Sequence, residues 1–354
     1  SAAACAQDSD VWSTDFSKRT VPLEELLSGG PSKDGIPAID RPKFQSVEQA
    51  NRWLSEREPV AVVEINGQAK AYPLQILIWH EIVNDVVADV PVVVTFCPLC
   101  NTTLAFDRRF DGRILDFGTT GYLRHSDLVM YDRQTETWWQ QATGEALIGE
   151  YAGRELTFIG SPVVSWAEFK GQYPTGTVLS RDTGHPSYAD RYGRNPYVGY
   201  DKPGSSPWSF FSRKNDDRLP AKERVVAVEL DNETRAYPFS ALSKRRVIED
   251  KIRGRHIVVL WAPGTASALD SATISSGRDV GATGVFDREL DGKRLRLEPL
   301  GESRFRDKET GSTWNVLGYA IAGPLAGRRL TPINHGNHFW FAWAVFKPET
   351  KVVR

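Results

Sequence analysis

The sequence predicts a mainly β fold of the α+β class, formed by two tandem homologous β-rich domains that each contain one or two helices. The prediction depends on short apolar runs, on the aromatic content and on an internal repeat. The apolar runs end at Gly, Pro, Asn or Asp, which is typical of strands. The chain also has 11 Trp and 1 Met, and rigid aromatic side chains favour strands.

An internal repeat divides most of the chain into two similar parts. The segment Val60–Leu74 matches Val225–Phe239 in the character of its residues, and each contains a Tyr-Pro pair. Further matches follow in the same order, such as Trp139 with Trp314. The repeated segment is far longer than one unit of a solenoid protein. We therefore predict an internal duplication of one domain.

The domain boundaries follow from the repeat. Ser46 and Gln49 have the spacing of a capping box, which indicates a helix over Val47–Arg57 in the N-terminal region. The segment between the repeats is rich in Tyr, Pro, Gly and Arg, and its aromatic residues indicate ordered packing. The expected parts are an N-terminal arm with one helix at 1–59, a first repeat at 60–180, an ordered irregular connection at 181–224 and a second repeat at 225–354.

Each repeat is expected to begin with a hairpin and to continue through one helix. Asn66-Gly67 is a strong signal for a two-residue hairpin turn. Pro73 suits the first turn of a helix, because the N–H that proline lacks would have no partner there. The continuous apolar run Val92–Phe96 indicates a buried strand. The other expected elements are strands at 60–65 and up to Tyr72, a helix that buries Leu74, Leu77, Ile78 and Ile82, and strands at Leu104–Phe110 and Ile114–Phe117.

Composition excludes several classes of protein. The net charge is −1 without a long run of one sign, so we expect no nucleic-acid partner. No apolar run reaches the ~18 residues of a membrane-spanning helix. Small residues precede Cys5, as at the end of a bacterial lipoprotein signal. We therefore predict an extracytoplasmic protein that a lipid on Cys5 would anchor, and the alternative is an expression remnant beside an incidental cysteine.

The reactive residues are confined to the first repeat. Cys97 and Cys100 form a CxxC motif, and His80-Glu81 precedes the strand that leads to it. The corresponding residues of the second repeat are Ala262, Thr265, Arg245 and Arg246. Residues needed by the fold should be present in both repeats, whereas these are not. The sequence therefore places the chemistry in the first repeat.

A metal ion is the leading interpretation of this motif. Two cysteine thiolates are soft ligands that favour copper(I) or zinc. His80 is the expected third ligand, and Glu81 would bind the ion, orient His80 or act as a base. His125 is a weaker ligand candidate, since it lies in a loop beside glycines. The alternative for each of these three side chains is an ordinary packed or solvated residue.

Two other functions remain open from the residues. In the first, Cys97 is the nucleophile of a thiol–disulfide or thiol-dependent enzyme and Cys100 resolves it. A thioredoxin-like fold is disfavoured, because the residues after Cys100 predict a strand where that fold needs a helix. In the second, a structural disulfide supports a module that binds a small molecule. His335 and His338 could form a second metal site, and His185 could cover the first.

Four runs of residues resemble the bacterial and archaeal family of unknown function DUF3179. The resemblance implies export for many members but no activity. In this chain Arg124-His125-Ser126-Asp127 replaces an expected Asn-Ser-Asn-Leu-like stretch, which makes His125 a less general ligand. The runs are Trp79–Asp85, Thr95–Asn101, Asp127–Arg133 and Thr143–Ala146, and the later segments Ser180–Gly184 and Arg191–Tyr197 fit the same family.

Overall fold

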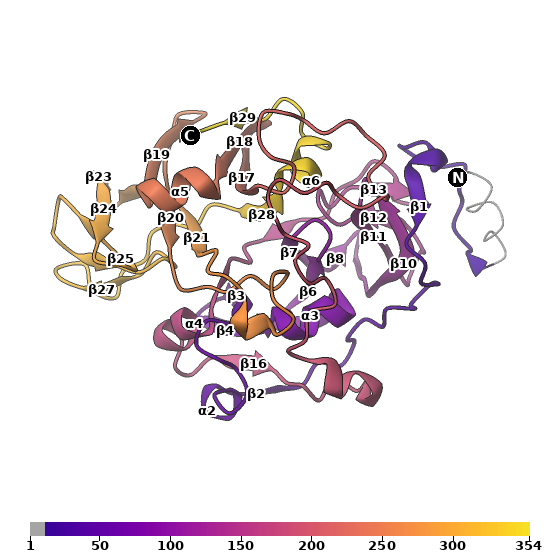
Figure 1. The fold of residues 1–354 in the computed structure, drawn as a ribbon, viewed down its shortest axis with the longest axis horizontal. Helices are drawn as coiled ribbons and strands as arrows, with labels where there is room; N and C mark the ends of the chain where they lie inside the picture. Colours follow the sequence, from indigo (N-terminus) through magenta and orange to yellow (C-terminus); the bar gives the residue numbers. More distant parts are fainter. Residues whose placement is uncertain (1–10) are drawn as a thin grey trace.

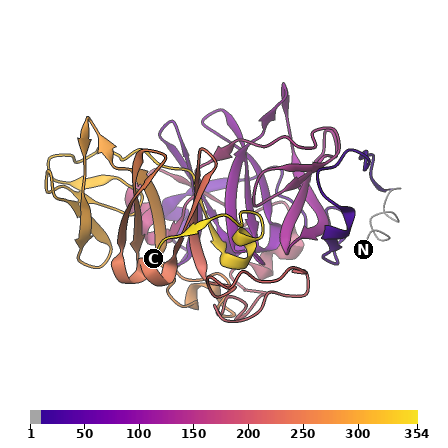
Figure 2. The same cartoon turned by 90° about the horizontal axis from the view of Figure 1, so that it is seen from above.

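A computed structural model describes residues 11–354, and Cys5 lies outside the described residues. The fold is mainly β with a few short helices, as predicted. The first and second repeats lie side by side along the long axis of the molecule (Figures 1 and 2). In the part of the chain from residue 11 onward, no helix combines the length and apolar character needed to cross a bilayer.

The first repeat begins with the predicted hairpin and helix. Asn66 and Gly67 both have positive φ values, 49° and 78°, as a tight two-residue hairpin turn requires. The helix that follows is almost wholly buried, which explains its apolar composition. The elements are β3 (Pro59–Ile65), β4 (Gln68–Pro73), α3 (Leu74–His80), β5 (Ile82–Val87), β6 (Val90–Cys97) and β7 (Thr102–Asp107).

The rest of the first repeat forms a further antiparallel sheet and adds strands to the two sheets that contain β3–β4 and β5–β7. Strands β10 to β13 form a meander, and β14 and β15 return to pair with β7 and β3. The expected strand at Leu104–Phe110 is divided between β7 and β8. The elements are β8 (Arg109–Phe110), β9 (Arg113–Ile114), β10 (Phe117–Arg124), β11 (Asp127–Asp132), β12 (Trp138–Gln140), β13 (Ala146–Ile148), β14 (Phe158–Ile159), β15 (Val163–Ser165), α4 (Trp166–Gln172) and β16 (Thr177–Leu179).

The N-terminal arm adds edge strands to the first repeat. Its helix has the predicted capping box but is shorter than expected, because Arg52 N and Trp53 N donate to the carbonyls three residues before them and the chain continues as turns. The arm contains η2 (Leu23–Glu25), β1 (Leu26–Ser28), β2 (Phe44–Ser46) and α2 (Val47–Ala50).

The second repeat starts with the same order of elements as the first. A hairpin, a seven-residue helix and three antiparallel strands follow one another in both. This order is what the predicted duplication requires, and the duplication itself stays an inference from the sequence. The connection contains η3 (Pro186–Arg191), and the second repeat contains β17 (Arg224–Leu230), β18 (Glu233–Pro238), α5 (Phe239–Arg245), β19 (Val247–Ile252), β20 (Arg255–Ala262), η4 (Ile274–Ser276), β21 (Ala282–Asp287), β22 (Glu289–Leu290), β23 (Lys293–Arg294), β24 (Leu297–Leu300), β25 (Arg304–Asp307), β26 (Thr313–Trp314), β27 (Ala320–Ala322), β28 (His335–Phe339), α6 (Trp340–Ala344) and β29 (Lys351–Val352).

The two repeats share their hydrophobic cores. The cluster that contains Cys97 and Cys100 also contains Phe339, Phe341 and Leu269 from the second repeat. A second cluster joins residues of β3 and β4 to residues of β20 and β21. Burial of apolar surface is the main stabilising term in folding, so each repeat depends on the other for stability.

A buried Trp–Asp bond occurs at matching places in both repeats. Trp139 Nε1 donates to Asp132 Oδ2 at 2.9 Å, and Trp314 Nε1 donates to Asp307 Oδ2 at 2.9 Å. Trp139→Phe and Trp314→Phe should each lower the free energy of unfolding by about 1–3 kcal/mol, because each removes a donor from a buried carboxylate. Urea unfolding would measure this, with Trp208→Phe as the exposed control. A loss in only one repeat would contradict the structural equivalence of the two sites.

Candidate metal centre

The turn between β6 and β7 places both sulfurs in the core. Cys97 ends β6, and Asn101 N donates to Pro98 O at 3.2 Å to close the turn. Asn101 has a φ of 52°, a left-handed conformation that asparagine tolerates better than most residues. Both cysteines are free thiols, exposed by 2% and 0%.

A second hairpin brings a carboxylate to the two thiols. His125 and Ser126 form the turn between β10 and β11, and both have positive φ values. The Ser126 carbonyl lies 3.7 Å from Cys97 Sγ and 3.2 Å from Cys100 Sγ. One ligand atom each from Cys97, Cys100 and Asp127 lies within 4.8 Å of the others. Within residues 11–354, no other three His, Cys, Asp or Glu side chains converge in this way.

The carboxylate of Asp127 has one oxygen fixed by nitrogen donors and one oxygen that has none. Its Oδ1 accepts hydrogen bonds from Gln140 Nε2 at 2.6 Å and from Ala142 N at 2.9 Å. Its Oδ2 is buried with no N–H or hydroxyl donor, and the thiols of Cys97 and Cys100 are the donors near the carboxylate. Carboxylates that bind metals are oriented by hydrogen bonds of the kind that Oδ1 accepts. The donor set therefore fits a metal ion at this oxygen and the two sulfurs, where the ion would replace the thiol protons.

The charges around the thiols also indicate a site for a cation. Burial raises the pKa of both cysteines, and the charge of Asp127 raises them further. Burial and the same aspartate raise the pKa of Glu81 to about 8. Burial raises the pKa of Asp127 itself to about 6. The charges that most disfavour ionisation of these groups come from within the cluster, and a divalent ion would reverse their effect.

His80 is not brought to the sulfurs. Its Nδ1 lies 2.7 Å from Pro37 O, and its Nε2 lies 2.7 Å from the Tyr192 hydroxyl. Burial lowers the pKa of His80 to about 4, so the ring is neutral. It also lies 5.2 Å from the ring of His185, measured between centroids. The two ring nitrogens thus attach the N-terminal arm and the connection to α3.

Glu81 lies beside the metal-ligand group without belonging to it. It caps the C-terminus of α3 with a φ of 59°, and its carbonyl accepts from Phe96 N at 2.8 Å. This bond attaches Glu81 to the strand that carries Cys97. Its charge contributes to the raised pKa of Cys97. The carboxyl is therefore near the thiols, and its role at the site stays a prediction.

The other candidate histidines lie outside the group. His125 Nε2 lies 3.2 Å from Glu25 Oε2, and Glu25 also pairs with Arg124 and Arg213. His338 Nδ1 lies 2.9 Å from the Thr102 hydroxyl, and His335 Nδ1 lies 2.8 Å from Ile333 O.

Sequence reasoning missed Asp127 as a ligand. No spacing connects it with Cys97, because the two residues come from different hairpins that meet only in the folded chain. The available signal was an acidic residue directly before the apolar run Leu128–Tyr131. A charged side chain at the start of a buried strand needs a partner.

The comparison with protein families identifies the chain. A family model described as a protein of unknown function, DUF3179, matches residues 33–350. The chain belongs to the DUF3179 family. The matched region includes Cys97, Cys100, Asp127 and Glu81, so the whole candidate centre of this DUF3179 protein lies within it. Comparisons with curated proteins and with solved structures find no match.

Proposed function

We propose that this DUF3179 protein binds one metal ion through Cys97, Cys100 and Asp127. The buried Oδ2 of Asp127, which has two free thiols beside it and no N–H or hydroxyl donor, is the observation that supports this most strongly. Zinc is the first choice, because thiolate and carboxylate ligands both occur in zinc sites. The two cysteines alone favour copper(I), and the carboxylate ligand shifts the preference to zinc. Glu81 lies beside this ligand set, and the charge of the ion would favour its ionised form.

The thiols have the wrong electrostatics for a thiol–disulfide enzyme. Reactive cysteines have a lowered pKa and partial exposure. Cys97 and Cys100 are buried and have raised pKa values. These features favour a bound metal over thiol exchange. We also propose an extracytoplasmic location with a lipid on Cys5. The only support for this part of the proposal is the sequence of small residues around Cys5.

Metal analysis of protein purified without oxygen tests the proposal. Wild type should contain about one Zn²⁺ per chain, and the Cys97→Ser/Cys100→Ser variant should contain none. His80→Gln should keep the metal, because both ring nitrogens of His80 are occupied within the protein. Loss of metal in His80→Gln, or its retention in the double variant, would contradict the proposed ligand set. One equivalent of copper in place of zinc would support the site and correct the metal.

A further inference from the structure

The turn that carries the two thiols is held by residues from outside the first repeat. The Tyr200 hydroxyl donates to Leu99 O at 3.1 Å, and Phe339 N donates to Cys100 O at 2.8 Å. Arg224 Nη1 donates to Asn101 Oδ1. These donors come from the connection and from β17 and β28 of the second repeat. Three consecutive residues of the turn are therefore each fixed by a partner far away in the sequence.

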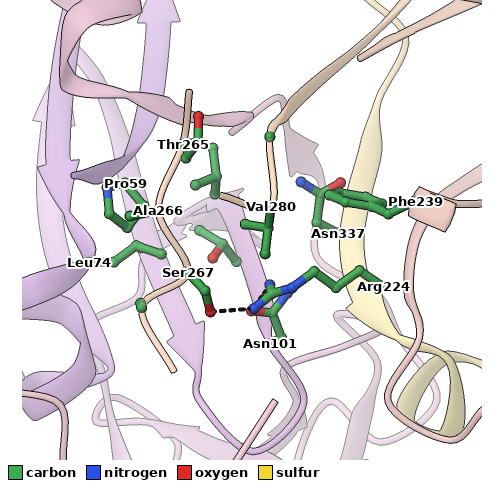
Figure 3. Close-up of a pocket in the computed structure, with 14 residues that line it drawn as sticks. Pro59, Leu74, Asn101, Arg224, Phe239, Thr265, Ala266, Ser267, Val280 and Asn337 are labelled. Atoms are coloured by element: carbon green, nitrogen blue, oxygen red, sulfur yellow. Dashed lines mark hydrogen bonds between the residues drawn. The ribbon is translucent and has the colours of Figure 1, made fainter. Parts of the chain in front are cut away.

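Arg224 is the centre of these contacts. Its Nη2 donates to Asp201 Oδ2 and to Ser267 Oγ, both at 2.8 Å. Figure 3 shows Asn101, Arg224 and Ser267 meeting between the two repeats. The cavity beside them has a volume of only about 30 Å³, enough for one or two water molecules. The Arg224 side chain is 11% exposed and donates to three acceptors, so it links the turn to the second repeat and to the connection.

We propose that the second repeat and the connection act as a clamp that sets the geometry of the thiol turn, with Arg224 as the positioning residue. This gives the second repeat a role although it lacks the thiols. The clamp rests on the proposed function only for its effect on metal binding. Its effect on the thiols themselves is independent of any metal.

Arg278 provides a matched control for Arg224. Both arginines bind the buried carboxylate of Asp201, and Arg278 Nη1 donates to Asp201 Oδ1 at 2.8 Å. Only Arg224 also contacts Asn101. Arg224→Met and Arg278→Met thus remove the same kind of charge from Asp201, but only the first releases the turn. Asn101→Gly releases the turn from its other end and suits the left-handed φ at this position.

The test measures how fast a neutral aromatic disulfide reagent modifies the thiols of metal-free protein under native conditions. Arg224→Met and Asn101→Gly should both react roughly tenfold faster than wild type, because the turn opens more readily. Arg278→Met should react within about twofold of wild type. Equal rates in the two arginine variants, or a wild-type rate in Asn101→Gly, would overturn the clamp. If Arg224→Met does not fold, the comparison of the thiol reaction rates of Asn101→Gly and wild type tests the clamp on its own.

The same variants then separate the clamp from the metal site. With Co²⁺ as the probe, Arg224→Met and Asn101→Gly should bind about 10–100-fold more weakly, as for other supporting contacts around ligands. Their Co²⁺ absorption should also change shape, which a general loss of stability would not cause. Faster thiol reaction with no Co²⁺ binding even in wild type would support the clamp and contradict the metal site. Unchanged affinity and spectrum in both variants would overturn the clamp as a metal-positioning device.

Discussion

Replacement of Asp127 by asparagine should lower the Zn²⁺ affinity by about 100-fold or more, since supporting residues alone account for 10–100-fold. Asparagine can still accept the hydrogen bonds from Gln140 and Ala142 that hold this side chain. It lacks the negative charge and places an amide nitrogen where Oδ2 of Asp127 lies. The same change should lower the pKa of both thiols, because the charge of Asp127 raises them in the wild type.

The two effects have opposite signs, which makes the test specific. Competition with a coloured chelator would measure the Zn²⁺ affinity, and thiolate absorption against pH would measure the pKa values. Asp132→Asn is the matched control, because Asp132 is equally buried on the same strand but binds Trp139. It should destabilise the protein and keep the Zn²⁺ affinity within a few-fold. Wild-type affinity in Asp127→Asn would remove Asp127 from the ligand set.

The local part of the fold could be predicted from the sequence because its causes are local. The turn at Asn66-Gly67 and the helix after Pro73 depend on backbone conformations that these residues prefer, and both are present. The length of α2 could not be predicted, because it ends where Arg52 N and Trp53 N turn to the carbonyls three residues before them. The shared cores of the two repeats depend on tertiary packing that the repeat pattern does not encode.

The candidate site could be predicted in part for the same reason. Cys97 and Cys100 belong to one tight turn, so their spacing alone brings the sulfurs together. Asp127 reaches them only because two hairpins pack face to face. His80 is close to the thiols in sequence, but the end of α3 directs its ring to Pro37 and Tyr192. The sequence therefore made His80 and Glu81 equally good candidates for the site. Only the fold shows that Glu81 lies near the thiols and that the ring of His80 is bound elsewhere.

The contribution of Glu81 to the stability of metal-free protein should fall as the pH rises from about 4.5 to about 8, and Glu81→Gln should remove this contribution. The folded pKa of Glu81 is about 8, against an ordinary value of 4.5. Between these values the Glu81 carboxyl of the folded protein keeps a proton that the unfolded chain has released, so the Glu81 contribution to the free energy of unfolding falls with rising pH. The full shift corresponds to at most about 5 kcal/mol, and on the order of 2–3 kcal/mol is expected after local relaxation.

Comparison of the two proteins isolates Glu81 from other titrating groups. Burial lowers the pKa of His80 and His125 to about 4 each, which makes stability rise with pH up to about 6.5 in both proteins. These contributions cancel in the difference between Glu81→Gln and wild type, which urea unfolding at several pH values would measure. Arg246→Gln controls for the backbone, because Arg246 caps α5 with a φ of 63° and changes no charge near the thiols.

Bound Zn²⁺ should abolish the effect of Glu81→Gln on the pH dependence. The ion would stabilise the ionised carboxyl and bring the pKa of Glu81 back towards its ordinary value. The metal-free difference between the two proteins should therefore grow from pH 5 to pH 8, and the Zn²⁺-bound difference should stay nearly constant. A difference that is independent of pH in metal-free protein would show that Glu81 is not held protonated in this cluster. A slope that persists with Zn²⁺ bound would place the ion away from Glu81.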